Sequence, residues 1–177
     1  MVKAKYGDRA QLLFTDTDSL MYDIATDDVY KEMWEQKDLY DFADYPPTNA
    51  YHDKTNNKVI GKFTDETKGD PIVEFVGLRP KMYSYQTRSQ ATGLITDKHR
   101  AKGIQAAASS SLRHADFLEQ LRDPKENRLP NRRIGKNFHH LYTIQVAVRR
   151  FLDILNCVYK GDFTYLVIFS TSVLNQT

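Results

Sequence analysis

The chain has 177 residues, 41% of them apolar and 12% aromatic, which is enough for one large or two small domains with a buried core. Its single cysteine, Cys157, excludes an internal disulfide and fits a reducing intracellular compartment, nucleus or cytoplasm rather than an organelle. No stretch approaches the roughly 20 apolar residues of a membrane span, so we expect no membrane partner.

The net charge of +2 hides an uneven distribution of charged residues. Residues 16–53 contain 11 Asp or Glu against 2 Lys, whereas residues 128–150 contain 6 Lys or Arg and no acid. This split favours one surface for cations and another for polyanions. The alternative is that the charges only solvate each face of the molecule.

Residues 10–24 form the first predicted element, a β-hairpin with the polar sequence Thr-Asp-Thr-Asp-Ser at its tip. Asp16 and Asp18 are two apart, and in an extended chain such residues point to the same side, although a turn redirects them. Two close carboxylates repel each other unless a cation or proton intervenes, and Mg²⁺ prefers hard oxygen ligands of this kind.

Two alternatives apply to this tip. An Asp in a turn commonly accepts hydrogen bonds from its own backbone, with no metal involved. A calcium-binding loop is excluded, because its sixth position would be Met21 instead of Gly and its twelfth would be Asp27 instead of Glu.

The middle of the chain predicts an antiparallel sheet covered by a helix. Asp27 and Asp28 precede a helical pattern over residues 29–37, in which we expect Trp34 to pack in the core. Residues 39–51 are irregular because of Pro46 and Pro47. Strands are predicted over residues 58–65, 72–77 and 81–86, with a turn over 67–71. With the hairpin, about five strands give an α+β fold.

Lys81 and Tyr83 lie two apart on the last of these strands and would share a face. A Lys ammonium binds phosphate and a Tyr hydroxyl hydrogen-bonds phosphate or sugar, so the pair is a candidate nucleic-acid contact. The alternative is that Tyr83 packs in the core while Lys81 extends to solvent from the sheet edge. Arg79 is a further candidate phosphate contact.

The second half of the chain is basic. Residues 86–98 have the composition of a linker, and residues 106–121 predict a helix that Pro124 ends. Residues 129–136 predict a basic loop, and alternation over residues 142–148 predicts a strand. A tracking surface for nucleic-acid phosphates is expected from Arg128, Arg132, Arg133 and Lys136. His139 and His140 do not predict a zinc site, because adjacent strand residues point apart and no partner has zinc spacing.

Two segments together resemble family B DNA polymerases of the protein-primed type, found in viruses, linear plasmids and self-replicating transposons. The run from Phe14 to Tyr22, FTDTDSLMY, resembles the palm hairpin that presents carboxylates to catalytic metals. The run from Gly77 to Ser84, GLRPKMYS, resembles the K-x-Y element of this branch. Residues 101–104, AKGI, look like the step from palm to thumb, although an ordinary turn fits as well. The resemblance covers roughly residues 1–148.

The resemblance implies a DNA-directed DNA polymerase with Mg²⁺ or Mn²⁺ as cofactor. Its expected partners are a DNA primer–template, deoxynucleoside triphosphates and a terminal priming protein. The implied domains are a partial palm over residues 1–98, a small basic thumb-like segment over 99–148 and a divergent tail over 149–177. Asp16 and Asp18 would bind metal, Thr17 the nucleotide, and the DNA or primer would be bound by Arg79, Lys81, Tyr83, Lys102, Arg128, Arg132, Arg133 and Lys136.

The sequence also departs from this family. We find no third metal-binding carboxylate from an earlier palm motif, no nucleotide-binding helix with Lys and Tyr, and no exonuclease motif. The chain start resembles a cut through a domain. The tail over residues 149–177 is compatible with a misread gene end. Within this tail we expect a helix over 151–159 and a strand over 165–170. We therefore expect the isolated chain to be inactive. The alternative function is a non-catalytic DNA-binding remnant of a mobile-element polymerase.

Overall fold

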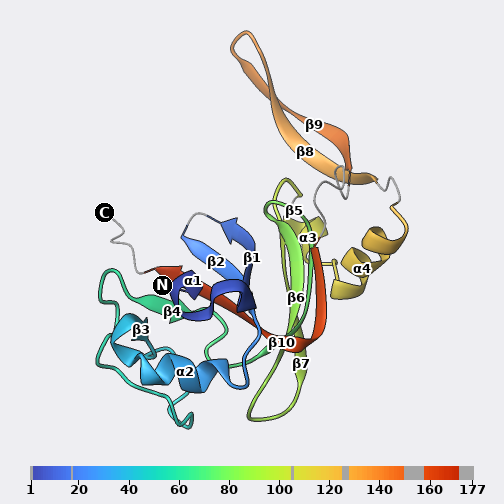
Figure 1. The fold of residues 1–177 in the computed structure, drawn as a ribbon. Helices are drawn as coiled ribbons and strands as arrows, with labels where there is room; N and C mark the ends of the chain where they lie inside the picture. Colours follow the sequence, from blue (N-terminus) through green and yellow to red (C-terminus); the bar gives the residue numbers. More distant parts are fainter. Residues whose placement is uncertain (1, 17, 105, 125–127, 150–157, 172–177) are drawn as a thin grey trace. The chain divides into compact units, whose positions relative to one another are not determined.

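The structure is a computed structural model that describes residues 2–16, 18–104, 106–124, 128–149 and 158–171 (Figure 1). The chain forms two compact units that interleave along the sequence. Unit 1 comprises residues 1–75, 86–96 and 160–177, and unit 2 comprises residues 76–85 and 97–159. These limits differ from the continuous ranges 1–98, 99–148 and 149–177 expected from the sequence.

Unit 1 contains the predicted hairpin, formed by β1 (Ala10–Asp16) and β2 (Ser19–Ile24) in antiparallel register. On its other side β2 pairs antiparallel with β10 (Val158–Thr171), and β10 also pairs antiparallel with β4 (Phe63–Asp65) (Figure 1). The short strand β3 (Tyr40–Asp41) pairs parallel with β4. The strand predicted over residues 165–170 is confirmed, whereas residues 151–157 of the predicted helix lie outside the described residues.

Helices of unit 1 lie before and after the hairpin in the chain. They are α1 (Val2–Tyr6), the 3-10 turn η1 (Gly7–Arg9), α2 (Val29–Glu35) and the 3-10 turn η2 (Lys37–Leu39). The predicted helix is confirmed by α2, whose N-terminus is capped because the Asp28 carboxylate accepts a hydrogen bond of 3.0 Å from the Lys31 amide. Its buried side chains, Val29, Tyr30 and Met33, join the core of the unit.

Aromatic side chains hold the irregular segment after α2 in place. Tyr40, Phe42 and Tyr45 are buried, and the Trp34 ring packs edge-on against Phe42 with 5.4 Å between ring centroids. Trp34 therefore packs in the core as predicted, and the segment is irregular apart from β3. Large buried aromatic surfaces supply apolar contact where the backbone forms few regular hydrogen bonds.

The strand predicted over residues 58–65 is mostly wrong, because only Phe63–Asp65 is extended. Lys58 and Gly61 have φ angles of 55° and 82°, in the left-handed region, which a strand does not tolerate. The turn predicted over residues 67–71 is confirmed, and the buried Asp65 carboxylate holds it. That carboxylate accepts four hydrogen bonds, from Thr67 N (2.9 Å), Thr67 Oγ1 (2.7 Å), Gly69 N (2.8 Å) and Tyr45 Oη (2.9 Å).

Three strands follow in a hydrogen-bonded row: β5 (Ile72–Arg79), β6 (Met82–Arg88) and β7 (Ile95–Ala101). The linker predicted over residues 86–98 is wrong, since its two ends belong to β6 and β7 and only the turn between them is irregular. Turn-type residues such as Gly93, with a φ angle of 71°, connect these strands and gave the segment its linker-like composition.

Unit 2 continues with two helices instead of the single helix predicted over residues 106–121. They are α3 (Ala106–Ser109) and α4 (His114–Arg122), and Pro124 follows the second as expected. Three consecutive serines, 109–111, lie at the end of α3 and directly after it, and serine hydroxyls compete with helical backbone hydrogen bonds. The buried Leu112 and Phe117 pack with Val76, Leu78 and Met82 in the core of this unit.

The predicted basic loop is instead a strand, β8 (Arg128–Asn137), which pairs antiparallel with β9 (His140–Arg149) in a two-stranded hairpin (Figure 1). The strand predicted over residues 142–148 is confirmed within β9. Pro130 and Gly135 suggested a loop. A two-stranded hairpin tolerates both residues, because each of its strands has one edge that is not hydrogen-bonded to another strand. The whole is an α+β fold with largely antiparallel strands, as predicted. No helix in the described ranges is long and apolar enough to span a membrane.

Candidate functional site

Asp16 and Asp18 lie at the tip of the β1–β2 hairpin. Asp16 is the last residue of β1 and is paired with Ser19, the first residue of β2. The turn between them therefore has two residues, of which Asp18 is exposed and Thr17 lies outside the described residues. Because the chain reverses here, the alternation rule for extended chains does not apply to these two aspartates.

A third carboxylate is hydrogen-bonded to this tip. The Ser19 hydroxyl donates a hydrogen bond of 2.5 Å to Oε1 of the exposed Glu66, which follows β4. Sequence reasoning missed Glu66, because only the pairing of β4 with β10, and of β10 with β2, brings it to the hairpin. Periodicity within one segment does not reveal such a pairing.

The carboxylates at the tip offer oxygen donors to a metal ion. Within the described residues, no group of three or more His, Cys, Asp or Glu side chains is arranged to hold a metal ion. Asp16 and Asp18 nevertheless provide hard oxygen donors, and Mg²⁺ usually takes one or two protein carboxylates and completes its shell with water and substrate phosphate. The donor set thus fits a metal that takes most of its ligands from outside the protein better than one enclosed by protein side chains.

In unit 2, Lys81 lies in the two-residue turn between β5 and β6, not on a strand as predicted. Lys81 follows Pro80 and has a φ angle of 60°. A residue in the left-handed region directly after a proline is characteristic of a type II turn. Glycine is preferred at this position, so Lys81 adopts a strained backbone conformation. Tyr83 does lie on β6, but Lys81 precedes the strand, so the prediction that the two share a strand face is wrong.

Three predicted DNA-binding residues meet at this turn. The Lys102 amide donates a hydrogen bond of 3.0 Å to the Lys81 carbonyl, and Arg79 Nη2 donates one of 3.3 Å to the Lys102 carbonyl. Arg79 Nε is buried and has no hydrogen-bond partner within the described part of the chain. Two hydrogen bonds thus bring three cationic residues to one turn, from two segments at least 21 residues apart in the sequence.

The two faces of β6 differ in chemistry. Tyr83 and Tyr85 stack with 6.4 Å between ring centroids. On the opposite face the fully buried Ser84 hydroxyl donates 3.0 Å to the Lys98 carbonyl and lies 2.9 Å from Nδ1 of the buried His114. Since the serine proton goes to Lys98, His114 Nδ1 carries the proton that Ser84 accepts. This polar contact joins α4 to the strand that carries Tyr83.

The β8–β9 hairpin carries the remaining predicted DNA-binding residues and has two unlike faces. Side chains directly opposite in the register share a face. One face has Arg128, Arg132 and Lys136 with Ile134 and Leu141; we call it the cationic face. The other face has Arg133, Gly135, Tyr142, Ile144 and Val146. Sequence reasoning grouped all four cations together, because a loop gives no basis for separating them.

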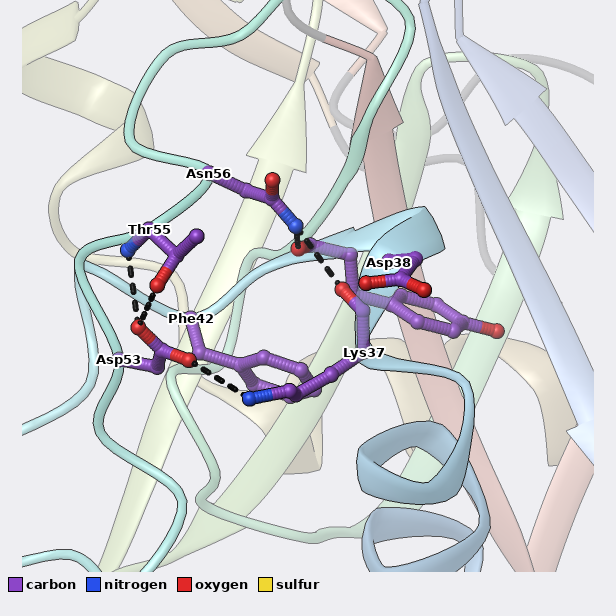
Figure 2. Close-up of a pocket in the computed structure, with 7 residues that line it drawn as sticks. Lys37, Asp38, Phe42, Asp53, Thr55 and Asn56 are labelled. Atoms are coloured by element: carbon purple, nitrogen blue, oxygen red, sulfur yellow. Dashed lines mark hydrogen bonds and ion pairs between the residues drawn. The ribbon is translucent and has the colours of Figure 1, made fainter.

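Unit 1 also has a small surface pocket, lined in part by Lys37, Asp53, Thr55 and Asn56. Figure 2 shows the Asp53 carboxylate between Thr55 and Lys37. Asp53 Oδ1 accepts hydrogen bonds from Thr55 N (2.8 Å) and Thr55 Oγ1 (2.5 Å), and Asp53 Oδ2 lies 3.5 Å from Lys37 Nζ. Asn56 Nδ2 donates to the carbonyls of Lys37 (2.9 Å) and Tyr40 (2.8 Å). These polar groups hold the loop in place, which accounts for the pocket without a ligand.

Comparison with known proteins gives no assignment: no family model, curated protein or solved structure matches this chain.

Proposed function

We propose that the chain is the palm and thumb part of a protein-primed family B DNA polymerase, whose reaction is nucleotidyl transfer to a DNA or protein primer. The observation that carries the proposal is the D-T-D-S sequence on a two-residue hairpin turn, with Asp16 at the strand end and Asp18 in the turn. The pairing of Asp16 with Ser19 puts both carboxylates at one end of the hairpin, and phosphoryl transfer depends mainly on the positioning of charged groups.

Asp16 and Asp18 are the residues that would hold Mg²⁺ or Mn²⁺. When bound, such ions neutralise charge on the attacking and leaving oxygens of the transferred phosphate. Glu66, fixed by the Ser19 hydroxyl, adds a negative charge beside the same tip. The chain itself contributes position and charge here, which are the main protein contributions to phosphoryl transfer.

The cationic groups of unit 2 would bind the primer–template. Arg79, Lys81 and Lys102 would supply cationic groups for phosphate binding, since two hydrogen bonds to backbone carbonyls bring these residues to one turn. Tyr83 on the adjoining strand adds a hydroxyl that can bind phosphate or sugar. The cationic face of the β8–β9 hairpin would follow the backbone of the duplex.

A second candidate function is a non-catalytic DNA-binding remnant. It is favoured by the sequence, in which we find neither the family's third metal-binding carboxylate nor its nucleotide-binding helix. An incomplete metal site would not position the nucleotide. In both functions the isolated chain does not extend primers, so catalysis alone does not separate them.

Binding of a fluorescent primer–template across a salt series, with and without Mg²⁺ or Mn²⁺, tests the proposal. The variants are Asp16→Asn/Asp18→Asn for the metal, and Lys81→Ala and Tyr83→Phe for the primer. Asp38→Asn/Asp44→Asn removes the same charge from exposed positions elsewhere in unit 1 and is the matched control.

The polymerase proposal predicts that metal strengthens binding by the wild type and by the control, and has no effect on the Asp16/Asp18 variant. It also predicts that Lys81→Ala weakens binding about 5- to 10-fold, as expected for a lost charge-assisted contact. Salt-sensitive binding that ignores metal in every variant would favour the DNA-binding remnant. Binding that is absent, or that does not depend on salt, would overturn both functions.

A further inference from the structure

The tip of the β8–β9 hairpin contains an unusual aromatic residue. Asn137 pairs with His140, so the loop consists of Phe138 and His139 alone. Phe138 is 84% exposed, and its φ angle of 50° lies in the left-handed region. Its ring therefore points into solvent from the end of a two-stranded ribbon.

Stability does not explain this residue. Glycine, asparagine and aspartate are preferred where a hairpin turn needs a positive φ angle, whereas a bulky residue there is an outlier. A single exposed apolar side chain is ordinary on protein surfaces. The combination of near-complete exposure with a strained backbone is not ordinary, and strain of this kind is concentrated at functional sites.

The surroundings of Phe138 indicate the class of ligand. The cationic face brings Arg128, Arg132 and Lys136 from the base of β8 almost to the tip. On the same face Ile134 and Leu141 are 76% and 72% exposed. Proteins that bind single-stranded nucleic acid combine a positive track for the phosphates with aromatic rings on which bases stack.

We propose that Phe138 stacks on an unpaired nucleic-acid base while the cationic face holds the neighbouring phosphates. The proposal rests on the nucleic-acid binding proposed above. It specifies which part of the nucleic acid the hairpin tip binds. An unpaired base is favoured over a paired one, because no stacking within the duplex has to be broken. A lipid surface is the other class of ligand for an apolar tip, but it would not use cations as distant as Arg128, at the start of the strand.

The test compares the wild-type chain of 177 residues with Phe138→Gly and Phe138→Trp. Glycine accepts the positive φ angle and removes the ring, and tryptophan keeps an aromatic surface. The ligands are a primer–template with an unpaired template overhang and a fully paired duplex of equal length. A 2-aminopurine in the overhang reports stacking by its fluorescence, and vesicles of anionic phospholipid serve as the lipid probe.

Phe138→Gly should weaken binding to the overhang substrate about 10-fold, the size of one lost base-stacking contact, and abolish the 2-aminopurine signal. Its thermal midpoint should stay equal or rise, and its salt dependence should be unchanged because no charge is lost. Phe138→Trp should bind as the wild type does, and affinity for paired duplex should be the same in all three proteins.

Wild-type affinity of Phe138→Gly for the overhang substrate would overturn the stacking proposal while leaving the DNA-binding function intact. Binding to the vesicles that depends on Phe138, without an effect on DNA, would overturn it in favour of a lipid surface. A failure of the proposed function looks different, because the wild type itself would then show no salt-sensitive DNA binding.

Discussion

Arg132 and Arg133 are consecutive in β8, but their side chains lie on opposite faces of the hairpin. Arg132 is opposite Gln145, and Arg133 is opposite Ile144. Only Arg132 shares its face with Lys136. The two arginines therefore carry the same charge but point to opposite faces of the hairpin, so each is a matched control for the other.

If the cationic face binds nucleic acid, Arg132→Ala should lower the slope of log affinity against log salt by about 1, the effect of one lost phosphate contact. Arg133→Ala, with the same change in net charge, should leave that slope nearly unchanged. Fluorescence anisotropy with a primer–template at several salt concentrations measures both slopes. Equal effects of the two substitutions would show that the hairpin acts only through its net charge.

Loss of the His114 imidazole should destabilise the chain, because the buried Ser84 hydroxyl then lacks its hydrogen-bond donor. We expect His114→Leu to lower the free energy of unfolding by about 1–3 kcal/mol. His114→Asn, which keeps a donor near Nδ1, should lose less. Urea unfolding measures both variants, and a cycle with Ser84→Ala isolates the pair; purely additive effects would mean that the two side chains do not interact.

Stability should depend on pH through Asp65. Burial raises the pKa of this carboxyl, although the four donated hydrogen bonds oppose the rise. A raised pKa means that the folded state binds the proton more tightly than the unfolded state does. The stability that this contributes is complete below the unfolded pKa and is lost as the pH rises through the folded value.

The stability difference between the wild type and Asp65→Asn should therefore shrink as the pH rises from the ordinary carboxyl range towards neutrality. Urea unfolding of both proteins at several pH values tests this. A difference that grows over the same interval would mean that the four hydrogen bonds outweigh burial and hold the pKa down.

Gly69→Ala should be more harmful than Gly61→Ala, although both glycines have positive φ angles, of 90° and 82°. A Cβ at Gly69 would lie 2.9 Å from Asn49 Nδ2 and 3.1 Å from Tyr45 Cε2, whereas one at Gly61 would meet nothing within 4 Å. Strain alone should cost about 1–2 kcal/mol at Gly61, and crowding should add about 1–3 kcal/mol at Gly69. Thermal unfolding gives the order, and equal losses would contradict the crowding.

Replacement of Lys160 should destabilise the chain, because it leaves the buried Asp23 carboxylate without its ion-pair partner. Lys160 Nζ lies 2.7 Å from Oδ2 of Asp23, whose side chain is only 8% exposed. We expect Lys160→Met to destabilise the chain by about 1–3 kcal/mol, and Asp23→Asn to restore part of the loss. Chemical denaturation of the two single variants and the double variant tests this pair, and no rescue by Asp23→Asn would argue against it.

Elements with strong local signals were predicted well. The β1–β2 hairpin, α2 with its Asp28 cap and the strand β9 follow from alternation, capping and turn residues close together in the sequence. The errors lie where local composition misled. Gly and Pro suggested a loop at β8, and apolar spacing continued across the serines that separate α3 from α4.

The arrangement of the candidate site could not be predicted from the sequence, because it depends on pairing between segments that are far apart in the chain. Glu66 reaches Ser19 only through strand order, and Lys102 meets Lys81 through a backbone hydrogen bond that no periodicity encodes. The left-handed conformation of Lys81 follows from the Arg79–Met82 turn, where a strand pattern was expected. Residue types were sufficient to nominate the site, and tertiary contacts determined its geometry.

The position of β10 has a consequence for how this protein is made. Residues 158–171 emerge from the ribosome after both β2 and β4, yet they pair with both strands. Until then the backbone groups of β2 that face β10 have no partner, and such an edge invites pairing with other chains. Unit 1 therefore completes its folding only after residues 158–171 have been translated, and chains that stop before β10 should be prone to aggregation and to capture by chaperones.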